Sequence, residues 1–344
     1  WEKGQEDAAS LASYLRLAQV PVEDGVMGAC LTKASCLLIG EMKEHEAFAG
    51  AEGGYQSDVA AMFAPVRYAG KAIGVLAVVR GREGGVFSEN DFDLFQSVAE
   101  QSAFALGNAL VHQEASAKRR MERELRVAAD VQKILLPSTD PEMPGYRIHG
   151  MNVPAQLISG DYYDYMPLDY GALGVAIADV SGKGVSAGLM MATCRSALRA
   201  AAVRTASPAE ALGVVNRQLF PDMREDMFIS LAYVILEAGS GRMRMARAGH
   251  DAPWMFRQES GVVEVMKPGG LALGVDDGPV FERVTKDFEC EFSSGDCLLL
   301  YTDGVNEAEN MEGEEFGKER MLDAFRGAAP RGAEAVVQAL NGQL

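Results

Sequence analysis

Three aspartates, each placed at the edge of an apolar or aromatic segment, are the residues of this sequence best suited to chemistry. They are Asp161 in ISGDYYDY (158–165), Asp179 in GVAIADVSGKG (174–184) and Asp303 in CLLLYTDGVNEA (297–308). A carboxylate that ends a buried strand costs free energy unless it is paired or binds a metal. Glycines follow Asp179 and Asp303 within a few residues, so the backbone can turn tightly beside whatever these side chains bind.

The chemistry that such acids support is hydrolysis assisted by a hard cation. Carboxylate ligands without clustered histidine or cysteine indicate Mg²⁺ or Mn²⁺ rather than zinc or copper. Two such ions about 3.5–4 Å apart could hold a bridging water as hydroxide and clamp the oxygens of a phosphoryl group. The sequence therefore predicts a two-metal site.

The elements expected to position these acids form a domain of mixed helices and strands. Strand patterns fall at 147–153, 172–180, 228–236, 242–248, 253–257 and 296–301. The Ala-rich segment 185–202 predicts a long helix, and a second helix begins at Pro208 with Ser207 as its cap. Many strands with helices in pairs favour an α+β sandwich, with the sheets inside and the helices outside.

Neighbouring polar residues are expected to have structural roles. His250 in AGHDAP is predicted to be a turn residue satisfied by backbone hydrogen bonds, in preference to a proton donor for a leaving group. In the strand after the first acid, Tyr162 and Tyr163 should face opposite sides. Asp164 should point toward the rim of the site, and Lys183 should be a solvated loop lysine.

The N-terminal part of the chain contains a hairpin and then a helix. Two apolar runs, 62–68 and 73–79, flank a short connection at Gly70. Ser88 and Asp91 have the spacing of a capping box in front of an apolar helix face.

A further helix is predicted over 110–136, where the chain is charged and has neither Gly nor Pro before Pro137. Its apolar positions nearly follow a heptad: Leu110, Ala117, Met121, Leu125, Ala128 and Leu135. This pattern favours a parallel dimeric helix, a coiled coil, that passes a signal between domains. The alternative is a solitary amphipathic linker lying on a domain surface.

Composition limits the partners and the compartment. The chain has 344 residues and a net charge of −17, which argues against binding to the phosphate backbone of nucleic acid. No apolar run approaches the ~18 residues that span a bilayer, although an anchor upstream of Trp1 stays open. The five cysteines form no CxxC pair and are expected to be reduced thiols of a cytoplasmic protein.

The first segment resembles a GAF domain. The residues that carry the resemblance are VPVEDGVMGACLTKASCLLIGE (20–41), the hairpin, and FSENDFDLFQSVAEQSAFALGNA (87–109). The resemblance implies an α/β/α sheet domain over 1–109, with the start of the family's fold missing or shortened. GAF domains bind small molecules or dimerise, and dimerisation without a ligand is expected here.

The rest of the chain, from about residue 125, resembles the PPM family of metal-dependent phosphatases and its bacterial SpoIIE/RsbU branch. The motifs occur in the family's order: VAADVQKILLP (127–137), SGDYYD, ADVSGKGVSAGLMMA, RAGHDAP (247–253), GLALGV (270–275) and LLLYTDGVNEA. The resemblance implies an αββα sandwich and dephosphorylation of phosphoserine or phosphothreonine on small STAS-domain anti-anti-sigma proteins, which regulates a sigma factor.

The resemblance also implies a role for each acid. Asp179 should bridge two Mn²⁺ or Mg²⁺ ions, with the backbone carbonyl of Val180 as a neighbouring ligand. Asp161 should serve one metal and Asp303 the other, and the nucleophile would be metal-activated water. The family supplies a further aspartate from a strand after the last helix, and no such strand is seen before Leu344, so the phosphatase domain is expected to be C-terminally incomplete.

The hypothesis is therefore a cytoplasmic, dimeric protein serine/threonine phosphatase regulated through its GAF-like domain. The domains are expected at 1–109 (GAF-like sensor), 110–136 (signalling helix) and 137–344 (phosphatase). One alternative is a catalytically weak pseudophosphatase that docks STAS proteins. A nucleotide cyclase is the other, because SGDYYD superficially resembles the acidic hairpin of diguanylate cyclases.

Overall fold

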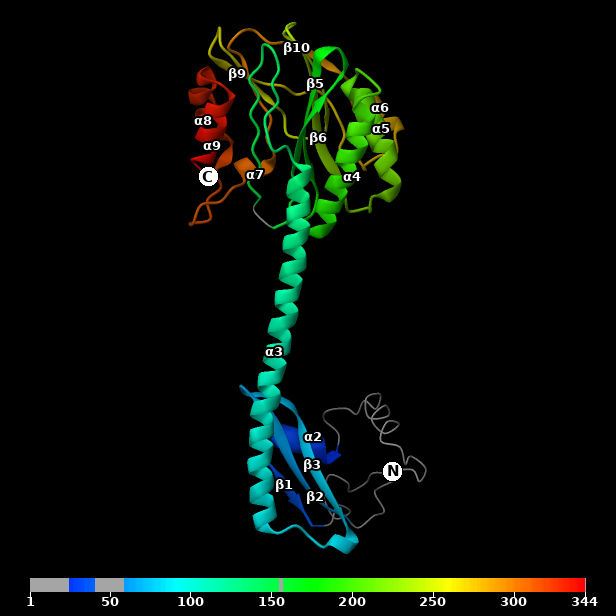
Figure 1. The fold of residues 1–344 in the computed structure, drawn as a ribbon, viewed down its shortest axis with the longest axis vertical. Coiled ribbons are helices and arrows are strands. Elements are labelled where there is room, and N and C mark those ends of the chain that lie inside the picture. The colour runs from blue at the N-terminus through cyan, green and yellow to red at the C-terminus, as the bar shows by residue number, and fades with distance from the viewer. Residues whose placement is uncertain (1–24, 41–58, 155–156, 344) are drawn as a thin grey trace. The chain divides into compact units, whose positions relative to one another are not determined.

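The computed structural model describes residues 25–40, 59–154 and 157–343 (Figure 1). The chain divides into two compact units, residues 1–120 and 121–344. In the described part of the first unit, the elements are α2 (Gly25–Lys33), β1 (Leu37–Ile39), β2 (Val59–Tyr68), β3 (Lys71–Gly81), η3 (Arg82–Gly84) and the start of α3 (Glu89–Leu135). The three strands form an antiparallel sheet in the order β1-β2-β3.

The predicted hairpin is confirmed as β2 and β3. Tyr68 pairs with Lys71, and the two connecting residues Ala69 and Gly70 both have positive φ, 48° and 80°. Two-residue turns of this kind match the right-handed twist of the strands. One face of the sheet packs on α2 and the other on α3, through two separate apolar clusters. This is the expected α/β/α layering.

Helix α3 begins at the predicted capping box. The Asp91 N–H donates to Ser88 Oγ at 3.2 Å, and the Ser88 N–H donates to Asp91 Oδ2 at 2.9 Å. The sequence patterns before and after residue 110 belong to one helix of 47 residues, with no break between them. Its buried residues, Phe95, Ala99, Ala103 and Gly107, recur every fourth position and lie only in the N-terminal half. Tertiary packing therefore holds this half of the helix. In the half that follows, several apolar side chains, including Met121 and Ile134, are exposed, whereas Leu135 packs on the core beside α4 and α5.

The second unit contains two antiparallel sheets. The larger has the order β10-β7-β6-β5-β4 and the smaller β11-β8-β9. The strands are β4 (Tyr162–Pro167), β5 (Ala172–Val180), β6 (Ile229–Glu237), β7 (Arg242–Ala248), β8 (Trp254–Arg257), β9 (Val262–Val265), β10 (Phe288–Glu291) and β11 (Cys297–Leu299). The helices are α4 (Val185–Ala202), α5 (Pro208–Leu219), α6 (Pro279–Val284), α7 (Asp303–Asn306), α8 (Gly317–Ala328) and α9 (Ala333–Asn341).

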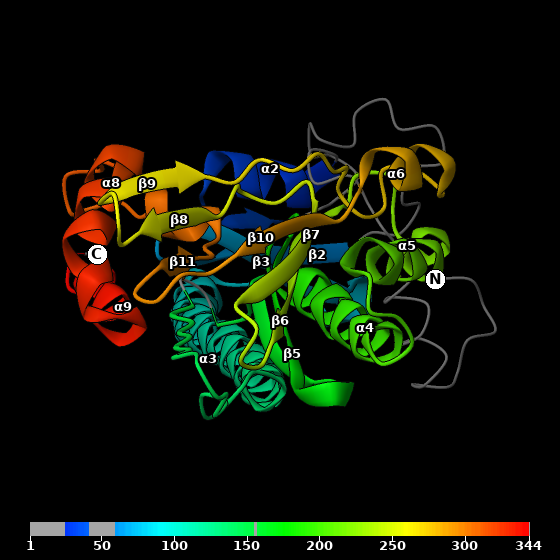
Figure 2. The ribbon, with the colours of Figure 1, turned by 90° about the horizontal axis from the view of Figure 1, so that it is seen from above.

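Three apolar cores stack these elements into four layers. One core joins α4 and α5 to the large sheet, a second lies between the two sheets, and a third joins the small sheet to α8 and α9. Figures 1 and 2 show α4 and α5 beside β5 and β6, and α8 and α9 beside the small sheet. The predicted αββα sandwich is thus observed. The Ser207 cap on α5 is also confirmed, since Ser207 Oγ accepts the Glu210 N–H at 3.1 Å.

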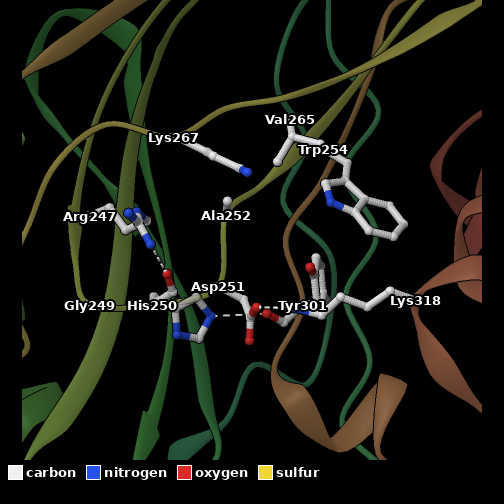
Figure 3. A pocket seen from close by; sticks show the side chains of 10 residues that line it. All are labelled: Arg247, Gly249, His250, Asp251, Ala252, Trp254, Val265, Lys267, Tyr301 and Lys318. Atoms are coloured by element: carbon white, nitrogen blue, oxygen red, sulfur yellow. Dashed lines mark hydrogen bonds and ion pairs between the residues drawn. The ribbon is translucent and has the colours of Figure 1, made fainter.

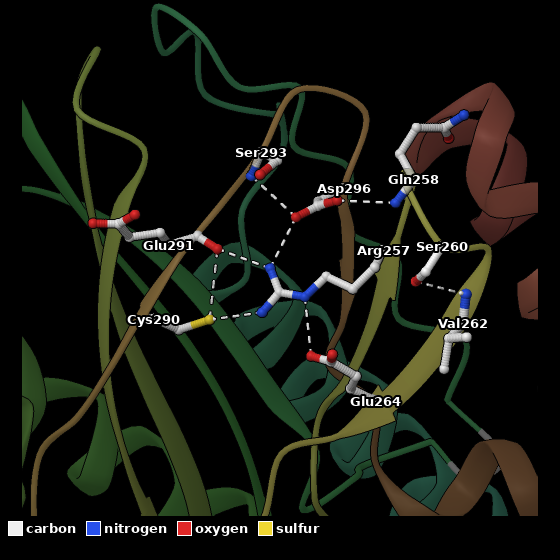
Figure 4. A network of polar contacts seen from close by, with 9 residues as sticks. All are labelled: Arg257, Gln258, Ser260, Val262, Glu264, Cys290, Glu291, Ser293 and Asp296. Carbon is white, nitrogen blue, oxygen red and sulfur yellow. Dashed lines mark hydrogen bonds and ion pairs between the residues drawn. The ribbon is translucent and has the colours of Figure 1, made fainter.

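A polar network ties the two sheets together at one edge (Figure 4). Arg257 of β8 donates to Asp296 Oδ2 at 2.9 Å, to Glu264 Oε2 of β9 at 2.9 Å and to the Glu291 carbonyl of β10 at 2.8 Å. The Asp296 side chain is only 1% exposed, so its charge is compensated almost entirely by this arginine and by backbone N–H groups. The network holds β10, the edge strand of the large sheet, against the small sheet.

One strand prediction is wrong. Residues 147–153 alternate in polarity but form no strand, and the Gly150 N–H bonds to the Asp140 side chain rather than to a partner strand. Its carboxylate accepts the Gly150 N–H at 3.1 Å, and Gly150 packs so closely on the rings of Tyr163 and Tyr165 that a Cβ would overlap them. The strand predicted at 296–301 is shorter than expected, because β11 covers only Cys297–Leu299.

All five cysteines are free, and no described helix is long and apolar enough to cross a membrane.

Candidate metal centre

Asp179 is carried by β5, which lies between β4 and β6 in the large sheet. Buried and half-buried positions alternate along this strand from Gly174 to Val180, so packing on both faces fixes its register. Asp179 pairs with Ser230 of β6 and is itself half-buried. The chain then turns into α4 through Gly182 and Gly184, which have φ of 94° and 78°. Only glycine adopts such angles readily, which explains the glycines that follow this acid.

The Asp161 loop lies directly against the end of β5. A Cβ on Gly160 would lie 2.6 Å from the Val180 carbonyl oxygen and 3.1 Å from Asp179 Oδ1, so only glycine fits there. Asp161 Oδ2 accepts the Ser159 hydroxyl at 2.9 Å, and Ser159 Oγ accepts the Asp161 N–H at 3.1 Å. The loop therefore brings Asp161 beside Asp179 and Val180 with its carboxylate already oriented.

Helix α3 holds this loop through a residue that the sequence patterns did not single out. Gln132 Nε2 donates to the Ser159 carbonyl at 2.5 Å, and the Ser159 N–H donates back to Gln132 Oε1 at 3.1 Å. Gly188 in the first turn of α4 packs on the same spot, because a Cβ there would meet Ile158 at 2.5 Å and Gln132 Nε2 at 3.4 Å. The end of α3, the Asp161 loop and the start of α4 therefore form one contact.

Asp303 reaches the same end of the sandwich from the small sheet. It follows β11 and is the first residue of the short helix α7, where it is exposed. Glu307 lies one turn on, with its N–H donating to the Asp303 carbonyl at 2.8 Å. Burial raises the pKa of Asp179 to about 7, with further contributions from the charges of Asp161, Asp303 and Glu307, while a hydrogen bond from the Val180 N–H opposes the shift.

These acids suit a divalent cation in charge and ligand type. Oxygen ligands are what Mg²⁺ and Mn²⁺ prefer, and a cation would offset both the burial and the neighbouring negative charges that raise the pKa of Asp179. Within the described residues, no three Asp, Glu, His or Cys side chains lie close enough to form a complete ligand set. Asp161, Asp303 and Glu307 are therefore near enough to Asp179 to raise its pKa, but their side chains do not form a complete ligand set as they stand.

His250 connects the two halves of the site (Figure 3). Only 2% exposed, it contacts the Ser230 hydroxyl through Nδ1 at 2.8 Å and the Tyr301 carbonyl through Nε2 at 3.0 Å. Burial lowers its pKa to about 4, so the ring is neutral, and Nε2–H is the donor to Tyr301. It therefore links the β6 partner of Asp179 to the segment that ends in Asp303, and its predicted structural role agrees with these contacts.

Asp164 does not lie at the rim of the site, contrary to the sequence-based expectation. Side chains alternate along β4, so Asp164 shares the face of Tyr162, which packs under α4. It is 1% exposed and accepts from Arg199 Nε and Nη2 at 2.6 Å each, and from the Tyr162 hydroxyl at 2.8 Å. Its role is to anchor α4 to the sheet. Lys183 is exposed in the turn before α4, as expected.

Comparisons with known proteins agree with this architecture. Residues 169–344, about half of the chain, match the family described as Stage II sporulation protein E (SpoIIE), and residues 2–107 match the GAF domain. Asp161 precedes the matched phosphatase segment. The proposal that Asp161 is a metal ligand therefore depends on the contacts of its loop with β5.

This chain spans only part of the length of the curated relatives that it matches. Phosphoserine phosphatase RsbU of Bacillus subtilis is 28% identical over 225 residues, which is 64% of this chain and 66% of RsbU. Protein IcfG of Synechocystis is 26% identical over 229 residues, 59% of this chain and 35% of IcfG. The solved SiaA-PP2C domain of Pseudomonas aeruginosa has the same fold, with a TM-score of 0.51 and 23% identity over 67% of this chain and 92% of that domain. The chain belongs to the SpoIIE family of PPM phosphatase domains, preceded by a GAF domain.

Proposed function

We propose that this protein is a metal-dependent protein serine/threonine phosphatase, a phosphoric monoester hydrolase. The observation that carries the proposal is the convergence of Asp161, Asp303 and Glu307 on Asp179, whose pKa is raised to about 7 by burial and by these charges. A half-buried carboxylate surrounded by acids gains most from a divalent cation. Membership of the SpoIIE family supports the same reading.

Each residue then has a defined task. Asp179 would hold two ions with the Val180 carbonyl beside it, Asp161 would serve one ion and Asp303 the other. Mn²⁺ or Mg²⁺ bound there would activate water and offset the charge of a phosphoryl group. The Ser159 hydroxyl orients the Asp161 carboxylate at 2.9 Å. His250, neutral and buried, holds the Tyr301 carbonyl and so fixes the segment that carries Asp303.

The proposed substrate is a phosphoserine or phosphothreonine on a STAS-type anti-anti-sigma protein, in the cytoplasm. The name of RsbU, a phosphoserine phosphatase, supports the phosphoserine part of this proposal. Asp303 and Glu307 are exposed, so a residue on the surface of a folded protein can reach them. We infer the STAS class from the motif resemblance.

The GAF domain would regulate the site through α3. Gln132 of that helix contacts the Asp161 loop, and both the nitrogen and the oxygen of its side-chain amide bond to Ser159. A shift of α3 would therefore move the loop that carries a proposed metal ligand. Apolar side chains on the same helix, including Met121, Val131 and Ile134, are 66%, 56% and 80% exposed, which favours a second copy of α3 as their partner in a homodimer.

The experiment is phosphate release from para-nitrophenyl phosphate and from a phosphoserine peptide, in Mn²⁺ and in EDTA. Wild type should turn over only with metal, and Asp179→Asn should fall to background. Asp169→Asn is the matched control, because Asp169 is exposed in the connection between β4 and β5, at the opposite end of β5. Metal-independent turnover, or equal loss in both variants, would contradict the proposal.

A second candidate is a docking module without turnover. The observation that favours it is that the described acids do not form a closed ligand set. No metal-dependent phosphate release, together with retained binding of a phosphorylated STAS protein, would select this candidate.

The proposed domain limits, 1–109, 110–136 and 137–344, are tested by limited proteolysis of the same protein.

A further inference from the structure

A basic pocket lies beside the proposed metal centre, and none of the roles assigned above uses it (Figure 3). Its volume is about 480 Å³, within the ~300–1,000 Å³ of small-ligand sites. The charged residues that line it are Arg247, Asp251, Lys267 and Lys318, and the titratable His250 and Tyr301 lie beside them. With His250 neutral, three cations face one carboxylate. The pocket is therefore positive on a chain whose net charge is −17.

Two of the three cationic side chains, Arg247 and Lys318, already have partners within the pocket wall. Arg247 donates through Nε to the Pro268 carbonyl at 3.0 Å and through Nη1 to the His250 carbonyl at 2.5 Å. Lys318 Nζ lies 2.8 Å from Asp251 Oδ1 and forms an ion pair with it. These contacts hold the walls in place and neutralise Asp251.

The third cationic side chain, Lys267, is the one that can bind a ligand. Within the described part of the chain it has neither a hydrogen bond nor an ion pair, and its side chain extends over Ala252 toward Val265 and Trp254. The Trp254 side chain is 5% exposed and fixed by ring contacts to Tyr301 and Phe325, so the apolar wall opposite the ammonium is rigid. Because Lys267 has no partner among the described residues, its ammonium is the group of this pocket that can pair with a short anionic side chain.

The position of the pocket connects it to the proposed reaction. Tyr301 lines the pocket and lies two residues before Asp303. His250 lines it as well and donates to the Tyr301 carbonyl at 3.0 Å. A polypeptide advances at most about 3.3–3.6 Å per residue, so residues close to a phosphoserine held near Asp303 can reach this pocket.

We infer that the pocket binds an acidic side chain of the protein substrate next to its phosphoserine, with Lys267 as the residue that sets this preference. The inference rests on the proposed phosphatase function and adds to it a substrate class, phosphoserine in an acidic sequence. An acidic substrate is repelled by the overall charge of the chain, so a local cation at the site decides its orientation.

The test measures binding, independently of turnover. Two fluorescein-labelled phosphoserine peptides that differ only in flanking Glu or Gln residues are titrated with the full chain in Mn²⁺, and fluorescence anisotropy is recorded. Wild type should bind the Glu peptide up to about fivefold more tightly, as expected for one ion pair to an exposed lysine. The preference should shrink as salt is raised.

Three variants make the result specific. Lys267→Met keeps the aliphatic stem and should abolish the preference, Lys267→Arg should retain it, and Lys286→Met, at an exposed lysine between α6 and β10, should match wild type. Equal binding of the two peptides by wild type, binding of neither, or an unchanged preference in Lys267→Met would overturn the inference. Loss of metal-dependent hydrolysis of para-nitrophenyl phosphate with the preference intact would instead count against the phosphatase function alone.

Discussion

Replacing Gln132 by alanine tests whether α3 controls the proposed metal centre. The substitution removes both hydrogen bonds to Ser159, at 2.5 and 3.1 Å, and leaves the backbone of Ser159 without these partners. Because Gly160 packs on the Val180 carbonyl next to Asp179, a displaced loop moves Asp161 away from the site. The loss should therefore appear in metal binding more than in overall stability.

The magnitude follows from the two bonds. Each neutral hydrogen bond contributes about 0.5–1.5 kcal/mol, so the pair contributes about 2 kcal/mol to holding the loop. If the loop must be ordered to bind metal, the same free energy appears as a roughly 30-fold weaker Mn²⁺ affinity. Helix propensity works in the opposite direction, since alanine is a slightly better helix former than glutamine.

The assay is isothermal titration of Mn²⁺ into wild type, Gln132→Ala and the control Gln113→Ala. Gln113 lies on the same helix and is exposed, so the control carries the same change in helix propensity without contact to the loop. Weaker Mn²⁺ binding is expected only in Gln132→Ala. A Mn²⁺ affinity within about twofold of that of Gln113→Ala would refute the reasoning, because the two hydrogen bonds would then not be coupled to the site.

Two further predictions concern stability. Arg199→Ala should lower the free energy of unfolding by about 2 kcal/mol in urea denaturation, because the buried Asp164 carboxylate loses its main partner while Arg195 Nε stays 3.7 Å away. Adding Asp164→Asn should recover part of that loss, and additive losses would contradict the ion-pair explanation. For Asp179, the folded-state pKa of about 7 lies above the ordinary value of about 3.9, so the metal-free native state holds a proton that the unfolded chain has lost. In EDTA, stability should therefore fall as pH rises from about 4 to about 7, and thermal unfolding of Asp179→Asn should lack this component. Parallel pH profiles for the two proteins would show that Asp179 does not carry the shift.

Local signals in the sequence were sufficient for many elements. The predicted helix 185–202 matches α4, and Ser207 caps α5 through the expected hydrogen bond, because caps and apolar periodicity act over a few residues. The two positive-φ residues at 69 and 70 close the predicted hairpin for the same reason. The alternation at 147–153 misled, because it does not reveal that Gly150 bonds to the Asp140 side chain and packs on Tyr163 and Tyr165.

The sequence by itself also placed Asp179 at the tip of a buried strand, because an apolar run that stops at an acid and a glycine marks such a tip; Asp303 instead lies four residues beyond its strand, at the start of α7. Only the tertiary structure decided which side chains meet there. Gln132 and Ser159 are 27 residues apart, and His250 and Tyr301 are 51 apart, so no local pattern links them. Likewise, Asp164 became a buried partner of Arg199 because the pleat of β4 turns it under α4. Sheet register and the packing of helices on the sheets set these contacts, and both depend on residues far away along the chain.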